Sequence, residues 1–486
     1  MSEHELVPLP EGTVSAKAKK LEKFLKSRVK GQSRALRYVY EYFEVLWANL
    51  KDPKRPIAVF IFLGPSGVGK TETARALAEY LFGDPDAMTL VACGNIEHGH
   101  EISVLLGAPP GYIGHNNPAL LSHWNVYKHH IKHLCLTGEY FEIGLKKSSE
   151  KIKRFEKKKN ELEAEADILI EKLIRLSKEL EDCETELEKY ERFCDDEDPG
   201  KTRDYKERIE NYERAIIRLK KALTKNEAKR ETVLKEYQEF SGVLEGFKKI
   251  QEKPPEERFN SLAAWIEENK FFFGIGEEKA ILLFDEIEKS AESTHHVLLQ
   301  IMEEGRVTLN SPAGAVTDLR NCIIIMTSNL GGNDIVDLLS GGENRIGFRA
   351  QCPFSPEELD QKIYELSLET LRRFFDPEFI NRINKKIVFR PLDRSAMLEI
   401  LEQRISESNS QNPIKLELDE KVKNFIVDET LKHPADGARL LKDRIVQFLA
   451  VEIAPMINEE ILKENDVVVV KLDKSEKKKL LFYRKK

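Results

Sequence analysis

Residues 57–71 read Ile-Ala-Val-Phe-Ile-Phe-Leu-Gly-Pro-Ser-Gly-Val-Gly-Lys-Thr, and this stretch decides the fold. It begins with an apolar run, and two further apolar runs occupy residues 281–284 and 322–326. Short apolar runs bounded by polar turns are typical of strands that are buried on both faces, as in a parallel sheet. We therefore predict an α/β fold built on a parallel sheet.

Each apolar run is followed by residues that carry chemistry. Residues 64–71 follow the first run, Asp285 and Glu286 the second, and Thr-Ser-Asn at 327–329 the third. Ligands of such sheets lie beyond the carboxyl ends of the strands. We therefore expect the three segments to meet in one crevice.

The segment 64–71 fits the pattern G-x-x-x-x-G-K-[ST], after a predicted strand and before a helical run. In this pattern backbone N–H groups wrap the phosphates, the lysine reaches the β- and γ-phosphates, and the hydroxyl ligates Mg²⁺. We predict a nucleotide site, and the alternative is a chance glycine-rich turn. The predicted nucleotide-binding residues here are Gly64, Pro65, Ser66, Gly67, Val68, Gly69, Lys70, Thr71 and Glu72.

Two carboxylates end the second predicted strand. We expect Asp285 to hold the Mg²⁺ shell together with Thr71, and Glu286 to orient and polarise the attacking water. The alternative is an acidic strand end that caps the next helix.

Heptad spacing marks a long insertion between the first two runs. Apolar residues recur with alternating 3,4 spacing across 152–190, interrupted only by Lys159, and a second seam spans 205–244. The turn-rich residues 195–200 lie between them. We predict an antiparallel coiled-coil hairpin with arms of roughly 45 to 49 residues, on the order of 70 Å long. A solvated single helix or a disordered charged linker is the alternative.

Charge supports the pairing of the two arms. Residues 179–196 are rich in acid and residues 201–221 are rich in base, so an antiparallel hairpin brings opposite charges together. Asn226 and Arg230 fall at seam positions, where polar side chains fix the register at some cost in stability.

Composition narrows the function classes. The 486 residues carry a formal net charge of -7, which argues against nucleic acid as a partner. No run approaches the length of a membrane span, residues 1–14 have no signal-peptide core, and the six cysteines form no CxxC pair. We expect a cytoplasmic protein without a membrane partner. Seven of the eleven histidines lie within 98–133, where we expect polar loops and a solvated helix face rather than a metal site.

Several ordered motifs can be compared with a known family. Residues 285–290 read Asp-Glu-Ile-Glu-Lys-Ser, 298–306 contain Leu-Leu-Gln and Gly-Arg, 326–331 read Met-Thr-Ser-Asn-Leu-Gly, and 377–383 read Pro-Glu-Phe-Ile-Asn-Arg-Ile. This order resembles the DEVEKAH, LLQxxxDGR, MTSNxG and PEFINRI runs of Clp-type AAA+ unfoldases. The match is closest to the second ATPase ring of the ClpA, ClpB and ClpC proteins.

Two shorter matches extend the resemblance, which covers roughly residues 20–127 and 275–486. Val29 begins a segment similar to the V-x-G-Q at the family's adenine pocket, and residues 437–439 look like the Gly-Ala-Arg of its small domain. The resemblance implies ATP and Mg²⁺ as cofactors and a ring of identical subunits, by analogy a hexamer.

The resemblance also implies further catalytic residues. Asn329 corresponds to sensor 1, Arg382 to the arginine finger that enters the next subunit's site, and Arg439 to sensor 2. For each arginine the alternative is a surface or intrachain ion pair.

Residues 107–114 resemble the family's pore loop, in which Tyr112, beside Ile113, would grip an extended polypeptide. An aromatic residue in such a loop could instead pack locally. Departures from the family pattern are Asp376 for an arginine, Asn384 for an aspartate, and residues 310–316, which lack the basic residue of a second pore loop.

Ile346, Gly347 and Phe348 lie between the predicted sensor 1 and arginine finger. They resemble the tripeptide with which some Clp unfoldases dock the ClpP peptidase. The alternative is that the Ile and Phe pack on their own domain.

We expect five segments, which are a tail and linker helix at 1–27, the large AAA+ domain at 28–144 and 251–390, the hairpin at 145–250 and a small α+β lid domain at 391–486. The expected function is an ATP-dependent unfoldase that threads polypeptide through a ring pore, with an unknown partner on the hairpin. The alternatives are an unfoldase coupled to a ClpP-like peptidase, and a nucleotide-switched scaffold.

Overall fold

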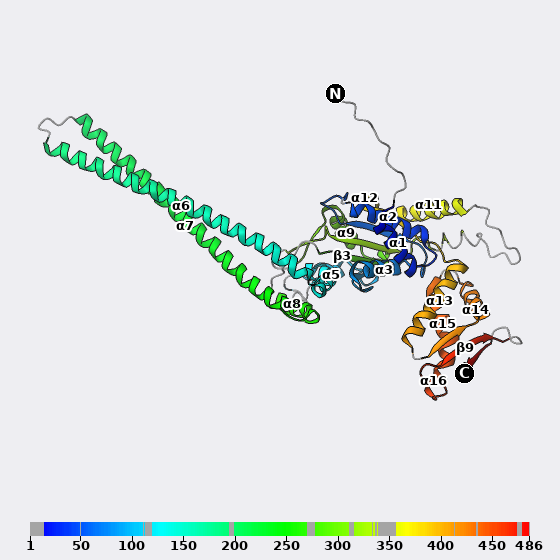
Figure 1. Ribbon diagram of the computed structural model, residues 1–486. Coiled ribbons are helices and arrows are strands. Elements are labelled where there is room, and N and C mark those ends of the chain that lie inside the picture. Colours follow the sequence, from blue (N-terminus) through cyan, green and yellow to red (C-terminus); the bar gives the residue numbers. More distant parts are fainter. Residues whose placement is uncertain are drawn as a thin grey trace, which may run out of the picture. The chain divides into compact units, whose positions relative to one another are not determined.

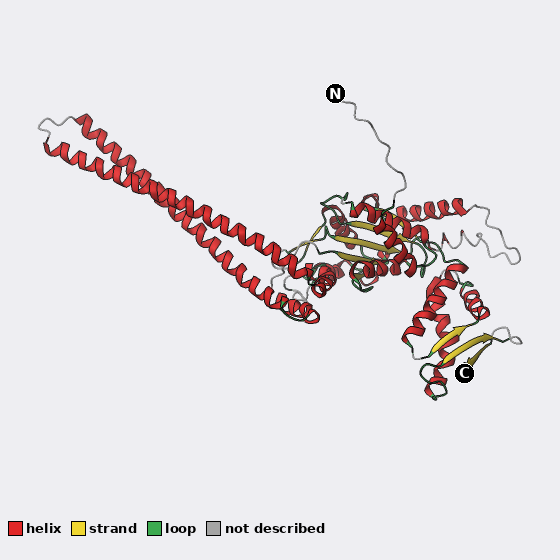
Figure 2. Cartoon of the chain, viewed as in Figure 1, coloured by secondary structure: helices red, strands yellow, loops and turns green. Residues whose placement is uncertain are grey.

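The computed structural model describes residues 14–48, 50–109, 111, 119–193, 199–269, 278–310, 315–332, 334–335, 338, 356–412, 414–433, 436–473 and 479–485. The chain forms two compact units, one of residues 1–130 with 277–486 and one of residues 131–276. The described part of the second unit is helical, whereas the first unit combines helices and strands (Figure 2). None of the described helices has the length and apolarity needed to cross a membrane.

A five-stranded sheet forms the centre of the first unit (Figure 1). Its order is β2-β3-β6-β1-β7, and all neighbouring strands are parallel. The strands are β1 (Ala58–Leu63), β2 (Thr89–Ala92), β3 (Ala280–Asp285), β6 (Cys322–Ser328) and β7 (Lys385–Val388). Because β1 and β6 are buried along their whole length, they carry the unbroken apolar runs of the sequence. The predicted parallel α/β sheet is confirmed.

Helices and short strands surround this sheet. The core on one face of it combines β1 residues such as Phe60 and Phe62 with Leu21, Leu36 and Phe389. The remaining elements of this part are α1 (Ala16–Arg28), α2 (Ser33–Trp47), α3 (Lys70–Phe82), η1 (Cys93–Asn95), η2 (Gly99–Ile102), α4 (Ser103–Leu106), α5 (His123–Thr137), η3 (Ile287–Lys289), α9 (Glu292–Glu304), β4 (Arg306–Thr308), β5 (Val316–Asp318), α11 (Pro356–Phe374) and α12 (Pro377–Arg382).

A separate apolar core, which includes Leu401, Ile426 and Val468, holds the C-terminal elements together. Their three-stranded sheet has the order β10-β9-β8, in which β8 and β9 are parallel and β9 and β10 antiparallel. The predicted small α+β domain is confirmed. Its elements are α13 (Arg394–Gln411), β8 (Lys415–Leu418), α14 (Glu420–Thr430), α15 (Gly437–Ile445), η5 (Val446–Ala450), α16 (Val451–Asn458), β9 (Val467–Leu472) and β10 (Leu480–Arg484).

The second unit contains two long helices, α6 (Glu139–Phe193) and α7 (Pro199–Gln251), followed by α8 (Pro255–Asn269). Figure 1 shows α6 and α7 side by side, and ring contacts fix their antiparallel register. Phe155 meets Tyr237 at 6.2 Å between ring centroids, and Tyr190 meets Tyr205 at 6.2 Å. The predicted coiled-coil hairpin is therefore confirmed.

Both polar seam residues of α7 find acidic partners on α6. Asn226 is buried, and its Nδ2 donates to Glu165 Oε2 at 3.1 Å. Arg230 Nη2 donates to Glu163 Oε1 at 3.1 Å. Cross-helix polar contacts of this kind penalise a shifted register, because any slip leaves a buried polar group without its partner.

Candidate nucleotide site

A cavity of about 380 Å³ lies at the carboxyl ends of β1, β3 and β6 and beside the start of α15. Most residues predicted to bind nucleotide or to act in catalysis line it, namely Val29, Ser66, Gly67, Val68, Gly69, Lys70, Thr71, Glu72, Asp285, Glu286, Asn329 and Arg439. Gly64 and Pro65 belong to the same loop, and their carbonyl oxygens accept hydrogen bonds from Lys70. The three polar segments that follow the buried strands therefore do meet in one crevice.

Three glycines of the loop between β1 and α3, at positions 64, 67 and 69, have positive φ angles. Gly67 and Gly69 have φ angles of 67° and 106°, in the left-handed region. A Cβ on Gly67 would lie 2.4 Å from the carbonyl oxygen of Asp436, so the close approach of the small domain also requires glycine. The loop leads into the first turn of α3, whose free N–H groups suit a phosphate.

Lys70 is the first residue of α3 and is buried. Its Nζ donates to Gly64 O at 2.6 Å, Pro65 O at 2.7 Å and Asn329 Oδ1 at 2.8 Å. Burial lowers the pKa of this ammonium to about 8. Because an adjacent phosphate favours the charged form, nucleotide binding would raise this pKa.

Thr327 at the end of β6 contacts the carboxylate of Asp285 and the backbone of Glu286. Its Oγ1 accepts from the backbone N–H of Glu286 at 3.0 Å and donates to Asp285 Oδ1 at 2.6 Å. Glu286 has a φ of 56°, which is unusual for a residue with a side chain. Such backbone strain is concentrated at functional sites, and here it sets the direction of the glutamate relative to the aspartate.

Asn329 and Lys289 contact the two oxygens of Glu286. Asn329 Nδ2 donates to Oε1 at 3.1 Å, and Lys289 Nζ donates to Oε2 at 2.6 Å. The Lys289 ammonium is the main cause that holds the pKa of the Glu286 carboxyl below its ordinary value. Glu286 is therefore ionised near neutral pH, as a residue that polarises water must be.

The two predicted Mg²⁺ ligands are neighbours. Thr71 Oγ1 donates to Asp285 Oδ1 at 3.2 Å. A hydroxyl and a carboxylate beside a phosphate-binding loop are the hard oxygen donors that Mg²⁺ takes together with water and phosphate oxygens. This donor set fits the ion.

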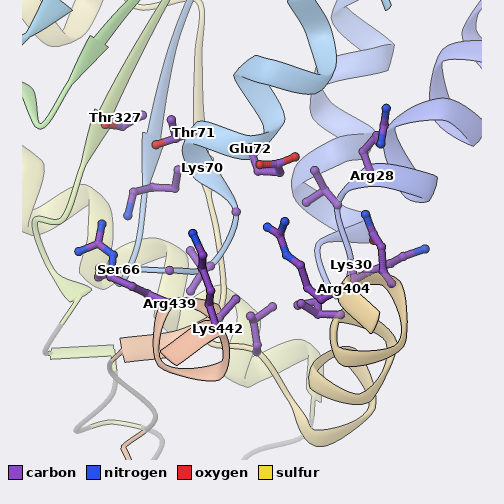
Figure 3. A pocket seen from close by; sticks show the side chains of 18 of the residues that line it. Arg28, Lys30, Ser66, Lys70, Thr71, Glu72, Thr327, Arg404, Arg439 and Lys442 are labelled. Carbon is purple, nitrogen blue, oxygen red and sulfur yellow. The ribbon is translucent and has the colours of Figure 1, made fainter. Parts of the chain in front are cut away.

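The small domain contributes the start of α15 to the cavity. The N–H of Ala438 donates to Gly67 O at 2.9 Å, and a Cβ on Gly437 would lie 2.7 Å from the same oxygen. Figure 3 shows Arg439 and Lys442 of α15 near Ser66, with Lys70 and Thr71 of α3 above them in this view. The lining holds six cations against four carboxylates, which suits a polyphosphate; they are Arg28, Lys30, Lys70, Arg404, Arg439 and Lys442 against Glu72, Asp285, Glu286 and Glu407.

The other end of the cavity is apolar with a polar edge. Val29, Leu392 and Ile400 line it, together with Gln403, whose Nε2 donates to Glu407 Oε1 at 2.9 Å. An apolar slot with a few polar groups is the usual setting for a planar base. Val29 therefore lies where a contact to the base is expected. Ile400 and Gln403 of α13 line the same end of the cavity and were not predicted from the sequence.

Arg382 does not belong to the lining of this cavity. Its Nη2 donates to Glu303 Oε1 at 2.8 Å and lies 3.9 Å from Glu378 Oε1. The side chain is 23% exposed. Within one chain Arg382 thus forms ion pairs, and its role as an arginine finger stays a prediction that requires a second subunit.

Two predicted sites lie outside the described residues. These are the pore-loop residues Tyr112 and Ile113, and the tripeptide Ile346, Gly347 and Phe348.

One departure from the family pattern has a structural role. Asn384 Oδ1 accepts from the backbone N–H of Val59 at 2.7 Å, and the N–H of Asn384 donates to Val59 O at 2.9 Å. Asn384 thus fixes the register between β1 and the start of β7.

Sequence reasoning did not assign roles to Thr327, Gln32 or Lys289. Gln32 is buried, and its amide joins Val68 O at 3.2 Å to Arg390 O at 2.8 Å, so it anchors the phosphate loop. Thr327 had a usable signal, since it precedes Asn329 at the carboxyl end of a buried strand. The ion pair of Lys289 with Glu286 follows from their three-residue separation in a helical turn.

Two family models match the chain. One, described as AAA domain (Cdc48 subfamily), matches residues 55–130 and 274–386, and the other, the C-terminal D2-small domain of ClpB protein, matches residues 392–470. The chain belongs to the Clp-type AAA+ family. The first match is interrupted between residues 130 and 274, so the α6–α7 hairpin is an insertion into the AAA+ domain.

Curated relatives of this Clp-type chain are distant and longer. The ATP-dependent Clp protease ATP-binding subunit ClpA homolog of Cyanidium caldarium is 25% identical over 481 residues, which are 98% of this chain and 38% of that protein. Chaperone protein ClpB of Aquifex aeolicus is 26% identical over 454 residues, covering 93% of this chain and 29% of that protein. The chain spans about a third of the length of the curated relatives it matches.

The fold is shared with a solved chaperone structure. The S. cerevisiae Hsp104:casein complex in its extended conformation matches 98% of this chain and 53% of the Hsp104 chain, with a TM-score of 0.55 and 21% sequence identity. At this identity the likeness concerns the fold alone.

Proposed function

We propose that this chain hydrolyses ATP and uses the energy to unfold or remodel polypeptides as part of a ring of identical subunits. The observation that carries the proposal is the hydrogen-bonded series Lys70–Asn329–Glu286 across the cavity. It joins the lysine that would bind the terminal phosphate to the carboxylate that would orient the attacking water. A site that only bound nucleotide would not need that carboxylate.

Each residue of the site has a distinct proposed task. Lys70 and the N–H groups of the phosphate loop bind the phosphates, and Glu286 accepts a proton from the attacking water. Asn329 keeps Glu286 aimed at the phosphate. Thr71 and Asp285 would hold Mg²⁺, which neutralises charge on the phosphate oxygens.

The ring is part of the proposal because the family resemblance implies it and because Arg382 does not line the cavity of its own chain. In a hexamer, as family resemblance implies, Arg382 would leave Glu303 and enter the neighbouring subunit's site, while Arg439 would link the small domain to the state of the nucleotide.

Polypeptide is the proposed substrate, because the fold is that of Hsp104, which was solved with casein. Tyr112 and Ile113 are the proposed gripping residues. A ClpP-like peptidase at Ile346, Gly347 and Phe348 is a further proposed partner. The four described cysteines, at 93, 135, 183 and 322, are buried free thiols, which is compatible with the proposed cytoplasmic location.

Glu286→Gln tests the proposal, because the amide keeps the shape of the carboxylate and cannot take a proton. We expect ATP to bind with unchanged affinity, measured with a fluorescent analogue, and steady-state hydrolysis to fall by at least about a hundredfold. Turnover within about tenfold of wild type would remove Glu286 from this role.

Tyr112→Ala tests the polypeptide part separately. ATP hydrolysis should be largely kept, and unfolding of a tagged stable reporter protein should be lost. The same reporter assay with and without ClpP tests the peptidase partner.

A further inference from the structure

A cavity of about 420 Å³ lies in the coiled-coil hairpin, distant in sequence from every nucleotide-site residue. It is open between α6 and α7 near the interruption of the first seam. Its lining consists of Phe155, Glu156, Lys159 and Glu163 from α6, and Glu227, Arg230, Glu231, Val233, Leu234 and Tyr237 from α7.

The cavity lies where charged residues occupy seam positions in two neighbouring layers of the coiled coil. Lys159 and Arg230 both stand where the 3,4 spacing calls for an apolar side chain. Each forms an ion pair with Glu163, at 3.9 Å and 3.1 Å. Their side chains are 57% and 40% exposed, so they turn outward instead of filling the seam. A space is left beside the apolar side chains of Phe155, Val233 and Leu234.

The heptad positions show on which side this space opens. With Phe155 and Val233 as d positions, Glu156, Glu163, Glu227 and Leu234 are all e positions of their helices. The e positions of two antiparallel helices lie on the same side of the seam. Because the cavity is lined from both helices by e positions, it opens on this side, which we call the e face.

The e face carries more apolar surface than a two-helix coil requires. Leu234 at the cavity is 48% exposed. Farther along, Ile170 is an e position and Ile174 and Ile217 are the adjoining b positions, with exposed fractions of 42%, 63% and 53%. A two-stranded coil needs apolar residues only at a and d, whereas helices of larger bundles add an apolar e or g position. These four exposed side chains form apolar surface on the e face that the seam between the two helices does not use.

The charge around the cavity indicates the chemistry of a third helix. Four of the lining residues are carboxylates, and two are cations. Glu163 is already paired with both cations, and Glu231 pairs with Lys235 of its own helix at 3.3 Å. Glu156 and Glu227 are the other acidic groups around the opening. A third helix that places Lys or Arg beside its apolar side chains would match this arrangement.

We propose that the e face of the hairpin docks a basic amphipathic helix of a partner protein, with one large apolar side chain in the cavity and further ones over Ile170, Ile174 and Ile217. This is a binding activity additional to ATP hydrolysis, and it does not depend on the nucleotide site.

The probe for the test is a synthetic amphipathic peptide of Leu and Lys in heptads, about 21 residues long, with a fluorophore at one end. The full chain should bind it with a Kd on the order of micromolar, measured by fluorescence anisotropy. Hydrogen exchange should show protection within 155–174 and 217–237. A peptide of the same composition in scrambled order should bind at least about tenfold more weakly.

Matched variants localise the interaction. Leu234→Glu should weaken binding by at least about tenfold, since it places a charge where the apolar side chain docks. Glu227→Lys combined with Glu231→Lys should weaken it by a similar factor at low salt. Ile168→Glu is the control, because Ile168 is 54% exposed but is a c position on the other side of the seam, and this variant should bind as wild type does. Circular dichroism checks that each variant keeps its helices.

Three outcomes would overturn the proposal. One is equal affinity of the peptide for wild type and Leu234→Glu. Another is equal binding of the scrambled peptide, which would show charge attraction alone. The third is self-association of the chain in sedimentation that Leu234→Glu abolishes while the peptide does not bind, which would make a second copy the occupant.

Discussion

The amide of Asn329 donates to the carboxylate of Glu286 over 3.1 Å. Its oxygen accepts from Lys70 on the other side, so Asn329 separates the anion from the cation while contacting both. Asn329→Ala should reduce kcat by roughly ten- to a hundredfold and change KM much less, because Asn329 orients the Glu286 carboxylate and contributes little to nucleotide affinity. Steady-state kinetics check this split. A rise in KM with unchanged kcat would assign Asn329 to binding alone.

Arg382 should act across a subunit boundary. Arg382→Ala alone should abolish hydrolysis, and mixing it with Glu286→Gln subunits should restore part of the activity. In a mixed ring, the Arg382→Ala subunit can supply an intact Glu286 and its Glu286→Gln neighbour an intact Arg382, so the site between them is complete. Oligomers are measured by sedimentation with ATP present, and their absence would contradict a shared site.

Glu303→Gln is the companion variant. Glu303 is 53% exposed and accepts from Arg382 at 2.8 Å, so the change removes charge without opening the core. Hydrolysis should be retained within about tenfold, since the finger itself stays in place. Loss of activity as complete as in Arg382→Ala would show that Glu303 has a catalytic task of its own.

The sheet and the phosphate loop could be predicted because their signals lie in consecutive residues. A buried parallel strand has an unbroken apolar run, and the loop after it has fixed spacing. Contacts between distant segments are harder to predict from the sequence. The hydrogen bond between Lys70 and Asn329, for example, joins residues 259 positions apart. The sequence predicted that the two segments meet at the carboxyl ends of the strands, but not which of their side chains are in contact.

The rest of the site depends on packing that no local pattern records. Leu392 and Ile400 reach the cavity because the small domain folds around its own core and then meets the phosphate loop at Gly67. The cavity of the hairpin was likewise not predicted. The sequence showed Lys159 and Arg230 as charged seam residues, but only the register of the two helices brings them into neighbouring layers beside one cavity.

Asn226 should stabilise the register at a cost in stability. It is 2% exposed, and its Oδ1 has no hydrogen-bond partner among the residues that the structure describes. Asn226→Leu should therefore raise the unfolding free energy of the hairpin by roughly 1–3 kcal/mol, measured by thermal and urea denaturation followed by circular dichroism. Disulfide trapping between cysteines introduced at Phe155 and Tyr237 should show a less uniform register. Lower stability in the variant would contradict this account.

His123 should make the large domain sensitive to acid. Burial lowers the pKa of its imidazole to about 4, against an ordinary value of about 6.5. The unfolded chain therefore binds the proton more readily, so the unfolding free energy falls as the pH drops from about 6.5 towards 4, by up to about 3 kcal/mol. His123→Gln should show a smaller fall in this window, measured by urea denaturation at several pH values. The same fall in both proteins would exclude His123 as its source.

The hairpin should be removable without loss of the ATPase. Its base is held by Phe141 and Phe247, both fully buried, with ring centroids 4.9 Å apart. Deletion of residues 148–244 keeps these two rings, and the antiparallel register brings the cut ends together, so a short Gly/Ser linker can join them. The five strands of the central sheet are all outside the deleted segment.

Deletion should therefore leave basal ATP hydrolysis within about twofold and keep ring formation, because Lys70, Glu286 and Arg382 are unchanged. Binding of the basic amphipathic peptide should be lost completely, since the whole e face is removed. The full chain with Leu234→Glu is the matched control, as it loses the same binding with the hairpin still present. Thermal unfolding and sedimentation of the wild type, the deletion and Leu234→Glu show whether the hairpin is needed for folding or for ring assembly. If the deleted protein unfolds at a much lower temperature or no longer forms rings, the hairpin is part of the assembly interface, because a self-contained insertion would leave both properties intact.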